Sequence, residues 1–578
     1  MDFLHYFKEV NSWQDLHSLL QTKTEKEKGD CFELLTKYAL RLDPKYKSQL
    51  KNVWLNHELP TYEREYLNQA IVDIGTDIIA QTNSGEYWAI QCKYHGDEDR
   101  SLTHSELSTF LSDAFVRSKH FSFGLVCSNA NRYSKYYSDV ERISFACNDF
   151  YSSLGKDFFE NVRKDLLGQK LKDPKPYKPF PHQKRAIKNG VKHFIKEGNK
   201  RGKLIFPCGS GKSLTGYWLS QKFEAQTVLV CVPSLSLIKQ TLDTWLRESV
   251  ATKTLIDWIC VCSDQSIGKS DDVAVYTKDL GVPVTTDITK ISKWLNDGLG
   301  KKVVFTTYQS GEVISRASKK SKTTFDLAIF DEAHKTVGRK DKLFSRLLFE
   351  ENINIRQRLF MTATERRYKG MRDEISSMDD HDLYGDTFEL LSFKEALELE
   401  PPILSDYKII TISVSEKEIE EFINSNAYVK PDKGNWTKDI EARTLASLIG
   451  LRKAMTEYPI MHAVSFHGSI SKAKAFEQSQ EKITNSFPQF NQIDHYHVTG
   501  SIPTSIRTRI VKEFTDAERA LITNAKCLTE GVDIPKIDCV LFADPRKSTI
   551  DIVQAVGRAL RLFEGKEWLY YSPYYCQG

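Results

Sequence analysis

The stretch LIFPCGSGKSLTGYWL, residues 204–219, starts as an apolar run, passes through two glycines and continues with apolar residues at helical spacing. This order predicts a buried strand, a tight turn and the first turns of a helix. Gly209, Ser210 and Gly211 form the turn, where backbone N–H groups can surround a phosphate at the helix N-terminus. Phe206 occupies the position of the first glycine in the full phosphate-loop pattern, so the prediction rests on the segment GSGKS.

Four side chains that follow this turn or a later strand are suited to a nucleoside triphosphate. Lys212 can reach the β- and γ-phosphates, and the hydroxyl of Ser213 can ligate Mg²⁺. The segment LAIFDEAH is an apolar strand that ends in two carboxylates. Asp331 can hold Mg²⁺, and Glu332 can orient a water that attacks the γ-phosphate. The sequence therefore predicts that the chain binds and hydrolyses ATP.

Amide and arginine side chains at the two ends of this region complete the predicted nucleotide site. The tripeptide PHQ precedes the phosphate loop, and the amide of its Gln183 fits the edge of an adenine. The segment QAVGRALR places Gln554, Arg558 and Arg561 on one helical face by three- and four-residue spacing. Arginines in such a position can reach across a cleft to the γ-phosphate, where they raise hydrolysis rates by about 10³ to 10⁵.

The order of these segments is similar to that of superfamily 2 helicases and translocases of the DEAH-lettered kind. The resemblance covers about residues 177–570 and implies two RecA-like domains, with ATP and Mg²⁺ between them and nucleic acid across the top. It also implies contacts with nucleic acid, or coupling of nucleic acid to ATP, for Ser234, Thr307, Thr523 and Gly531. Ordinary helix capping and strand-end chemistry is the alternative for each of these four.

The chain after residue 180 alternates short apolar runs with helical stretches. TVLVCVP, KKVVFTT, FDLAIFDEAH, QRLFMTAT and CVLFADP are typical of buried parallel strands in α/β units. We therefore expect an α/β fold over this region.

Composition and charge limit the possible functions. The 578 residues exceed what one hydrophobic core usually organises, and 81 basic against 77 acidic residues leave a formal net charge of +4. Any nucleic-acid surface therefore has to be a local patch. The eleven cysteines are scattered without a C-x-x-C pair, and no apolar run approaches the length of a membrane span. We expect a cytoplasmic protein with no membrane partner and no disulfide framework.

A second predicted site lies near the amino terminus, in two alternating strands joined by a turn near Ser84. In EYWAIQCKYH, residues 86–95, the apolar side chains share one face, and Gln91 and Lys93 project from the other, which we expect to be open to solvent. A turn at this place pairs positions whose numbers sum to 168, so Asp77 faces Gln91. Carboxylate and amide oxygens can hold Mg²⁺, and an ammonium can orient a water, so the hairpin is suited to phosphodiester hydrolysis.

The pattern G-x-D that ends at Asp77, followed by Q-x-K, resembles the Mrr-like branch of the PD-(D/E)xK nucleases. The neighbouring segments agree in order: a helix over KEKGDCFELLTKYAL, a strand at NVWLN, the hairpin, a helix over HSELSTFLSDAFVRS and a strand at FSFGLVCSN. The resemblance implies a restriction-endonuclease-like fold in which Glu33 completes the site. Gln91 replaces the usual acidic ligand and removes one charge from the metal site. Two alternatives are a polar solvent face and a DNA clamp that has lost hydrolysis.

The combined order of segments is similar to the N-terminal portion of Type ISP restriction-modification enzymes, the single-polypeptide relatives of Type I systems. We expect a nuclease domain over residues 1–165, a linker over 166–180 with four nearby prolines, an ATP-binding RecA-like domain over 181–385 and a second RecA-like domain over 386–578.

The same resemblance implies a translocase on double-stranded DNA coupled to a site-directed endonuclease. The chain contains no N-P-P-[YF] tetrapeptide of an adenine methyltransferase. We therefore expect the methyltransferase and target-recognition segments in a longer polypeptide or a separate subunit. A stand-alone repair or defence helicase-nuclease, and an RNA helicase whose amino-terminal domain only binds, are the alternatives.

Overall fold

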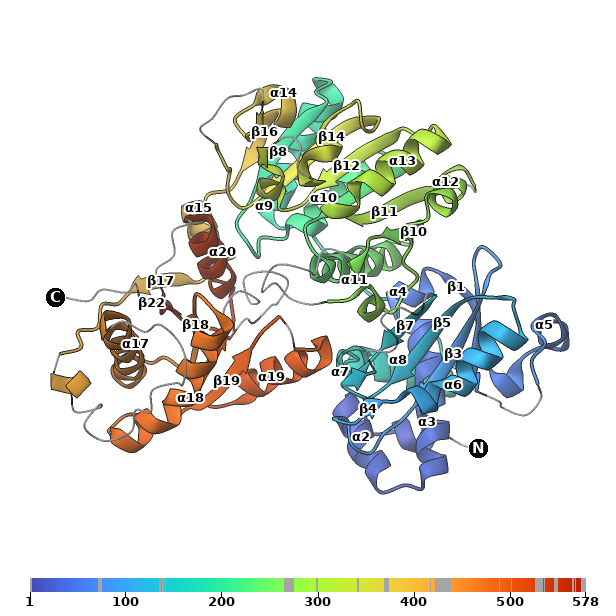
Figure 1. The fold of residues 1–578 in the computed structure, drawn as a ribbon. Helices are drawn as coiled ribbons and strands as arrows, with labels where there is room; N and C mark the ends of the chain where they lie inside the picture. The colour runs from blue at the N-terminus through green and yellow to red at the C-terminus, as the bar shows by residue number, and fades with distance from the viewer. Residues whose placement is uncertain are drawn as a thin grey trace.

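The computed structural model of the chain consists of three α/β units, each built on its own main sheet (Figure 1). We call them the amino-terminal, middle and carboxy-terminal domains. No helix among the described residues is long and apolar enough to cross a bilayer. The described residues are 3–70, 75–134, 137, 140, 142–264, 275–297, 300–339, 343–368, 374–415, 417–420, 438–487, 489–500, 502–524, 534, 536–544, 549–563, 566 and 568–572.

The amino-terminal domain has a five-stranded sheet in the order β1-β2-β3-β5-β7. β2 pairs antiparallel with β1 and β3, whereas β3, β5 and β7 run parallel. Ile78 lies opposite Ile90, and Ala80 lies opposite Trp88, so the predicted register of the hairpin is confirmed. The elements are α1 (Leu4–Phe7), α2 (Trp13–Gln21), α3 (Glu25–Leu42), α4 (Pro44–Lys47), β1 (Leu50–Leu55), α5 (Thr61–Tyr66), β2 (Ile78–Thr82), β3 (Tyr87–Lys93), β4 (Ser101–Leu102), α6 (His104–Ser112), β5 (Phe121–Ser128), β6 (Arg132–Tyr133), β7 (Ile143–Ala146), α7 (Asn148–Ser152) and α8 (Lys156–Leu166).

Both faces of β3 are buried, which corrects the expectation that one face is open to solvent. Trp88, Ile90 and Cys92 pack in the core cluster that includes the apolar side chains of α3. Ala89, on the opposite face, packs in a second cluster with Phe110 of α6. β3 is the central strand of the sheet, so helices cover its polar side chains as well as its apolar ones.

The middle domain has a seven-stranded parallel sheet in the order β10-β11-β9-β12-β14-β8-β16. β9, β11, β12 and β14 confirm four of the predicted strands. The sheet includes β16, which pairs with β8, so it extends past residue 385, where the sequence places a domain boundary. The elements are α9 (Pro181–Val191), β8 (Arg201–Ile205), α10 (Lys212–Lys222), β9 (Thr227–Val232), α11 (Leu235–Ala251), β10 (Ile256–Val261), α12 (Ile288–Asn296), β11 (Lys301–Thr307), α13 (Gly311–Ser321), β12 (Phe325–Phe330), β13 (Gly338–Arg339), β14 (Ile355–Thr362), β15 (Ile375–Ser376), α14 (His381–Tyr384) and β16 (Asp386–Leu390).

The carboxy-terminal domain has a six-stranded parallel sheet in the order β17-β22-β21-β18-β20-β19. β21 confirms the strand predicted at CVLFADP. The elements are α15 (Phe393–Glu398), β17 (Asp406–Ile409), α17 (Lys438–Glu457), β18 (His462–Phe466), α18 (Ile470–Ser486), β19 (Asp494–Val498), α19 (Thr504–Asp516), β20 (Ala520–Asn524), β21 (Cys539–Phe542), α20 (Thr549–Ala559) and β22 (Trp568–Ser572).

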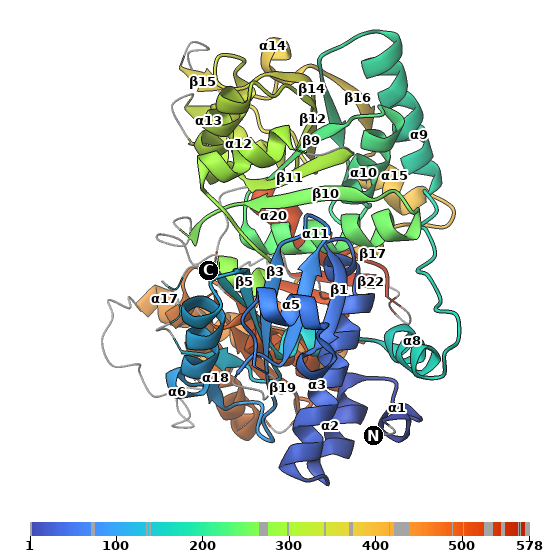
Figure 2. The same ribbon diagram turned by 90° about the vertical axis from the view of Figure 1, so that its right-hand side faces the viewer.

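Residues 167–180 contain neither helix nor strand and run along the outside of the molecule from α8 to α9 (Figure 2). The guanidinium of Arg247 lies 3.8 Å from the centre of the Tyr177 ring, and the backbone N–H of Tyr177 donates to Glu248 at 3.0 Å. These contacts attach the Pro-rich segment to α11.

Candidate functional sites

The predicted ATP residues meet at the carboxyl ends of three adjacent strands of the middle domain. The phosphate loop follows β8, Asp331 and Glu332 follow β12, and Thr362 closes β14. The sheet order β12-β14-β8 makes these strand ends neighbours. The carboxyl ends of parallel strands are the usual place for ligands in open α/β sheets.

The phosphate loop is held in a curved conformation that requires glycine. Gly209 and Gly211 both have φ of 82°, in the left-handed region where a Cβ is costly. The Ser210 hydroxyl donates to the carbonyl of Pro207 at 2.7 Å, and the amide of Gln183 donates to the carbonyl of Gly211 at 3.2 Å. α10 begins at the next residue, so the loop lies at a helix N-terminus, where backbone N–H groups favour anions.

Lys212 connects the phosphate loop to the carboxylates at the end of β12. Its buried ammonium donates to the carbonyls of Phe206 at 3.3 Å and Pro207 at 3.4 Å, and lies 3.9 Å from a carboxylate oxygen of Glu332. The residue that replaces the first glycine of the motif, Phe206, is itself fully buried. Lys212 therefore stands between the phosphate loop and the carboxylate expected to orient water.

Ser213 and Asp331 fit a Mg²⁺ ion. The Ser213 hydroxyl is buried and has no hydrogen-bond partner among the residues that the structure describes. One oxygen of Asp331 accepts from the backbone N–H of Glu332 at 2.9 Å, which fixes the carboxylate on the strand end. A hydroxyl and a carboxylate are oxygen ligands of the kind Mg²⁺ takes beside triphosphates.

His334 is a functional candidate to which sequence reasoning gave no role, although it is the last letter of LAIFDEAH. Its ring nitrogen lies 3.1 Å from the hydroxyl of Thr362 and 3.4 Å from a carboxylate oxygen of Glu332. Burial lowers the pKa of His334 to about 4, although Glu332 acts in the opposite direction. A neutral His334 therefore joins Glu332, after the end of β12, to Thr362, the last residue of β14.

Gln183, predicted to read the adenine edge, is 2% exposed and has both amide atoms engaged within the protein. Its oxygen accepts from the backbone N–H of Phe180 at 2.9 Å, which caps α9, and its nitrogen donates to Gly211. In this arrangement Gln183 supports the phosphate loop. To contact an adenine, its amide would have to break its hydrogen bonds with Phe180 and Gly211.

Arg561 reaches the phosphate loop from the carboxy-terminal domain. It follows the end of α20 and forms a bridge with Leu404, so it does not lie on the helical face that the spacing predicted. A Cβ built on Gly209 would lie 3.1 Å from Cγ and 3.2 Å from Nε of Arg561. A Cβ on Gly557 of α20 would lie 3.5 Å from Cβ of Cys208, so the helix itself also packs on the loop. The side chains of Gln554 and Arg558 lie outside the described part of the structure.

Two of the predicted nuclease residues, Asp77 and Gln91, contact each other on the hairpin. The amide nitrogen of Gln91 donates to Asp77, and the same carboxylate oxygen accepts from the backbone N–H of Cys92 at 2.5 Å. Asp77 is 5% exposed and Gln91 is 2% exposed. Asp77 is therefore a buried carboxylate held by two donors from β3.

Asp77 is positioned by two neighbouring contacts that the sequence did not reveal. The backbone N–H of Asn56 donates to the carbonyl of Asp77 at 2.8 Å, and the side-chain amide of Asn56 donates to the carbonyl of Thr76 at 2.8 Å. The Thr76 hydroxyl donates to the buried carboxylate of Asp113 at 2.8 Å. Gly75 has φ of 124°, and a Cβ there would lie 3.0 Å from the backbone nitrogen of Phe110. The glycine of G-x-D thus allows α6 to pack directly against this turn.

Glu33 and Lys93 complete the predicted nuclease set, and both are half-buried. Burial raises the pKa of the Cys92 thiol, and the negative charges of Asp77 and Glu33 act in the same direction. No ion pair of the Lys93 ammonium occurs within the described residues. The donor set fits Mg²⁺ with fewer charges than a site of three carboxylates, because the amide of Gln91 is neutral.

The four residues implied in nucleic-acid contact have different surroundings. Ser234 caps α11 and accepts from the backbone N–H of Leu237 at 3.4 Å. Thr307 is fully buried, with its hydroxyl 3.3 Å from that of Ser310. Thr523 is also fully buried and donates to the carbonyl of Tyr496 at 3.3 Å. Gly531 lies outside the described residues.

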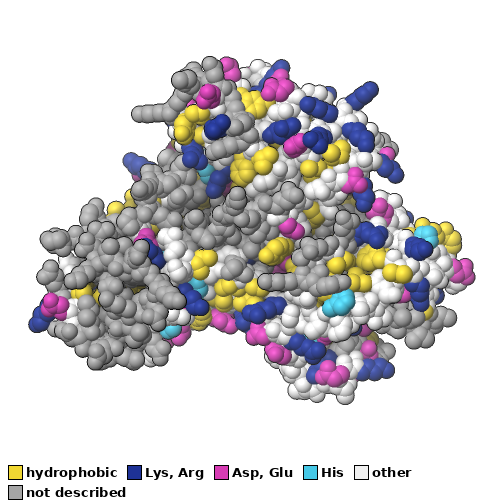
Figure 3. All heavy atoms as spheres, in the orientation of Figure 1, with side chains coloured by type: hydrophobic (Ala, Val, Ile, Leu, Met, Phe, Trp, Pro, Cys, Tyr) yellow, Lys and Arg dark blue, Asp and Glu magenta, His cyan; other side chains and the backbone are white. Residues whose placement is uncertain are grey.

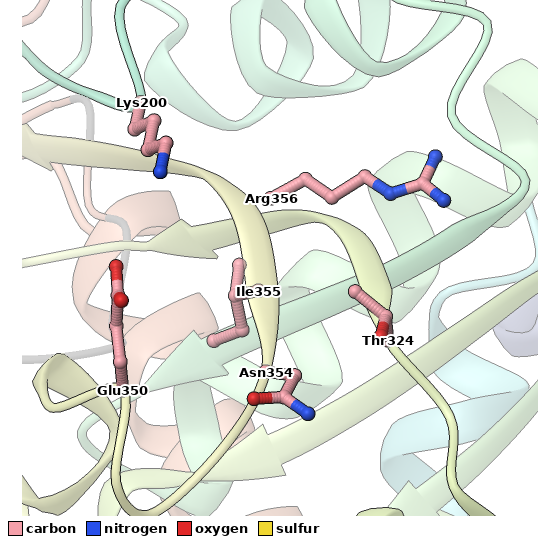
Figure 4. Close-up of a pocket in the computed structure, with 6 residues that line it drawn as sticks. All are labelled: Lys200, Thr324, Glu350, Asn354, Ile355 and Arg356. Atoms are coloured by element: carbon pink, nitrogen blue, oxygen red, sulfur yellow. The ribbon is translucent and has the colours of Figure 1, made fainter.

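A shallow pocket and a basic surface lie on the middle domain, away from the strand ends described above. The pocket has a volume of about 340 Å³ and is lined by Lys200, Thr324, Glu350, Asn354, Ile355 and Arg356 (Figure 4). It lies at the amino ends of β8, β12 and β14, opposite the ATP residues. Lysine and arginine side chains also gather over the upper right of the middle domain in Figure 3.

Comparison with known proteins agrees with this arrangement. Residues 41–143 match the family described as "Restriction endonuclease", residues 176–367 match "Type III restriction enzyme, res subunit", and residues 457–563 match "Helicase conserved C-terminal domain". A protein described as a probable helicase of African swine fever virus is 24% identical over 381 residues, which are 66% of this chain and 39% of that protein.

These matches place a segment similar to restriction endonucleases before two segments similar to helicase domains. In fold and domain order the chain is similar to the ATP-dependent Type ISP restriction-modification enzyme LlaBIII, solved bound to DNA. The TM-score is 0.80 and the identity 26%, over 97% of this chain and 37% of that enzyme. The chain thus spans less than two fifths of the length of either relative.

Proposed function

We propose that the chain couples ATP-dependent translocation on double-stranded DNA to Mg²⁺-dependent DNA cleavage, as part of a restriction-modification system. The observation that carries this proposal is the presence of two separate sites on one chain. Arg561 lies against the phosphate loop between the helicase domains, and Asp77 lies beside Gln91 in the nuclease domain. Similarity to a DNA-bound Type ISP enzyme supports double-stranded DNA as the partner.

At the ATP site, Lys212 and Arg561 approach the phosphate loop from opposite domains and would offset the negative charge that develops on the γ-phosphate. Glu332 would orient the attacking water, and Ser213 and Asp331 would hold Mg²⁺. Neutral His334 would transmit the state of Glu332 to Thr362 through its short contacts with both.

At the nuclease site, Asp77, the Gln91 carbonyl and Glu33 would hold Mg²⁺, and Lys93 would orient the attacking water. When bound, the ion polarises a phosphoryl oxygen and lowers the pKa of water. The Gln91 amide has to turn its oxygen toward the ion, since its nitrogen donates to Asp77 in this structure. Because that amide adds no charge, we propose a requirement for millimolar Mg²⁺.

We assign sequence specificity to methyltransferase and target-recognition segments, in a longer polypeptide or a separate subunit. Contacts of this chain with DNA would then involve the phosphate backbone and be independent of sequence. The cytoplasm is the proposed location, because the eleven cysteines are scattered along the sequence without a C-x-x-C pair, as expected in a reducing compartment.

A DNA clamp without hydrolysis is a second candidate for the amino-terminal domain. The observation in its favour is the bond from the Gln91 amide to Asp77, which occupies the carboxylate that a metal would need. Nicking of supercoiled plasmid in Mg²⁺ or Mn²⁺ separates the two functions, because a clamp leaves the plasmid intact.

The test of translocation is displacement of a third strand from a triplex on linear duplex DNA, followed with ATP and beside a strand-separation assay. We expect ATP-dependent triplex displacement and an ATPase that duplex DNA stimulates. Stimulation by RNA but not by DNA would contradict the proposal and favour an RNA helicase. Efficient strand separation without triplex displacement would contradict duplex tracking.

A further inference from the structure

The amino-terminal domain is fixed to the middle domain by buried contacts. The indole of Trp258 in β10 donates to the Ser48 hydroxyl at 2.9 Å, and the Lys45 ammonium donates to the carbonyl of Leu280 at 3.3 Å. A Cβ on Gly281 would lie 2.8 Å from the hydroxyl of Tyr46, which shows how closely the Tyr46 side chain approaches the backbone of the middle domain. These contacts predict that the two domains move together.

The carboxy-terminal domain reaches the same nuclease domain through α19. Ser505 of α19 donates to Asp149 of α7 at 2.9 Å, and Asp149 pairs with Lys239 of α11 at 2.5 Å. The three domains therefore meet at one carboxylate. One turn along α19, the guanidinium of Arg509 pairs with Asp99 at 2.5 Å. Figure 1 shows α19 pointing toward α7.

Asp99 belongs to the loop of residues 94–100, which directly follows Lys93 of the nuclease hairpin. The amide of Asn131 donates to Asp99 at 3.2 Å. The neighbouring Glu98 accepts from Trp13 at 3.0 Å and from Asn148 at 2.9 Å. Asn148 precedes Asp149 in the chain, so the two contacts of α19 act on the same hydrogen-bonded network as the loop.

The domain that carries α19 also carries Arg561, which lies against Gly209. Opening of the helicase domains would withdraw Arg561 from the phosphate loop. Since α19 and α20 both belong to the carboxy-terminal domain, that movement would also draw α19 away from the amino-terminal domain.

We propose that α19 is a positioning element for the nuclease site: closure of the helicase domains on nucleotide seats Ser505 and Arg509 on the nuclease domain and holds the loop after Lys93 in place. This inference rests on the proposed function, because it concerns regulation of the same nuclease site. Ser505 and Arg509 do not touch the reacting atoms and act through Asp149 and Asp99.

The expected size of the effect is modest. The Arg509 and Asp99 side chains are 36% and 56% exposed, and exposed ion pairs change an equilibrium by a factor of about five at most. Such a factor can alter the population of an ordered loop without altering the fold.

The test is amide hydrogen exchange of residues 94–100 in the full chain, with and without a non-hydrolysable ATP analogue and Mg²⁺. We expect the analogue to slow exchange in this loop about threefold in the unmodified protein. Arg509→Ala should lose this response, and Arg509→Lys should restore part of it. Lys512→Ala is the matched control, because Lys512 is an exposed cation on the same helix. It should respond like the unmodified protein.

Two results would overturn the inference. One is an equal nucleotide response in Arg509→Ala. The other is an unchanged exchange rate at residues 94–100 in the unmodified protein, under conditions where exchange at residues 207–213 shows that the analogue is bound. Plasmid nicking on the same samples separates this inference from the proposed function. A nucleotide response that Arg509→Ala removes, in a protein that never nicks DNA, supports the positioning role and contradicts the nuclease. Nicking without a nucleotide response supports the nuclease and contradicts the positioning role.

Discussion

Arg561 of the second helicase domain lies across Gly209 of the phosphate loop in the first, close enough for a Cβ on the glycine to lie 3.1 Å from Cγ of the arginine. The two residues are far apart in the chain and come from different sheets. A contact between these two residues is what an arginine finger requires, because its charge has to reach the γ-phosphate from across the cleft.

Arg561→Ala should keep nucleotide binding within about threefold and lower ATP turnover by about 10³ or more, as expected when a transition-state charge is removed. Fluorescent-nucleotide titration and ATPase rates measure the two effects separately. Leu562→Ala, at an exposed neighbouring position, is the control. A fall in affinity by the same factor as turnover would assign Arg561 to binding.

Lys212→Ala should abolish ATP hydrolysis and triplex displacement, because the ammonium expected to bind the β- and γ-phosphates is lost. The folded structure should survive, since the Lys212 ammonium makes two long hydrogen bonds to carbonyls, at 3.3 and 3.4 Å, and a long ion pair at 3.9 Å. ATPase and circular dichroism on one sample check both points. DNA-stimulated ATPase in this variant would contradict the assignment of the loop.

Gln91→Glu should lower the Mg²⁺ concentration for half-maximal cleavage by about tenfold. The change removes the amide that donates to Asp77 and adds a second carboxylate, which favours a divalent cation. Gln81→Glu, on the other strand of the same hairpin, should leave the Mg²⁺ dependence unchanged. An unaltered midpoint in Gln91→Glu would exclude Gln91 as a metal ligand.

The pKa of His334, held near 4 by burial, predicts a loss of stability in weak acid. Since its ordinary value is near 6.5, the unfolded chain binds more protons between these values. The contribution of neutral His334 to the free energy of unfolding is therefore complete above pH 6.5. It is lost as the pH falls toward 4, and the loss is about 3 kcal/mol at most. The first thermal transition of His334→Gln should fall less between pH 7 and 5 than that of the unmodified protein.

Substitution of the exposed His381 by Gln is the control for this comparison. It should leave the pH dependence of the unmodified protein in place. If the temperature of the first thermal transition fell equally with pH in His334→Gln and in the unmodified protein, another group would be responsible for the loss of stability.

The sequence predicted local geometry well where a short period governs it. Apolar and polar residues alternate along both strands of the hairpin, and a turn near Ser84 joins the strands. Together these features predicted that Ile78 pairs with Ile90, which the structure confirms. The phosphate loop and LAIFDEAH were also predictable, because glycines and carboxylates follow apolar strands in both. Parallel sheets bring such strand ends together.

Features that depend on distant packing were not predictable. The polar face of β3 is buried because α6 packs against Gly75, a contact that the alternation of β3 does not encode. β16 was missed as a strand of the first sheet because it lies at a sheet edge and its first residues, Asp386 and Thr387, are exposed and polar. The meeting of three domains at Asp149 arises only from the tertiary fold.

The most direct test of two separate sites on one chain is the Lys93→Ala variant, with Mg²⁺-dependent DNA cleavage and DNA-stimulated ATPase measured on one preparation. Lys93 is half-buried, so its truncation is gentler than that of Asp77, whose loss would leave the buried donors of Gln91 and Cys92 unpaired. The recognition segments should be supplied if cleavage requires them. We predict that cleavage is abolished and ATPase is retained. Undiminished cleavage, or loss of ATPase together with cleavage, would contradict the account.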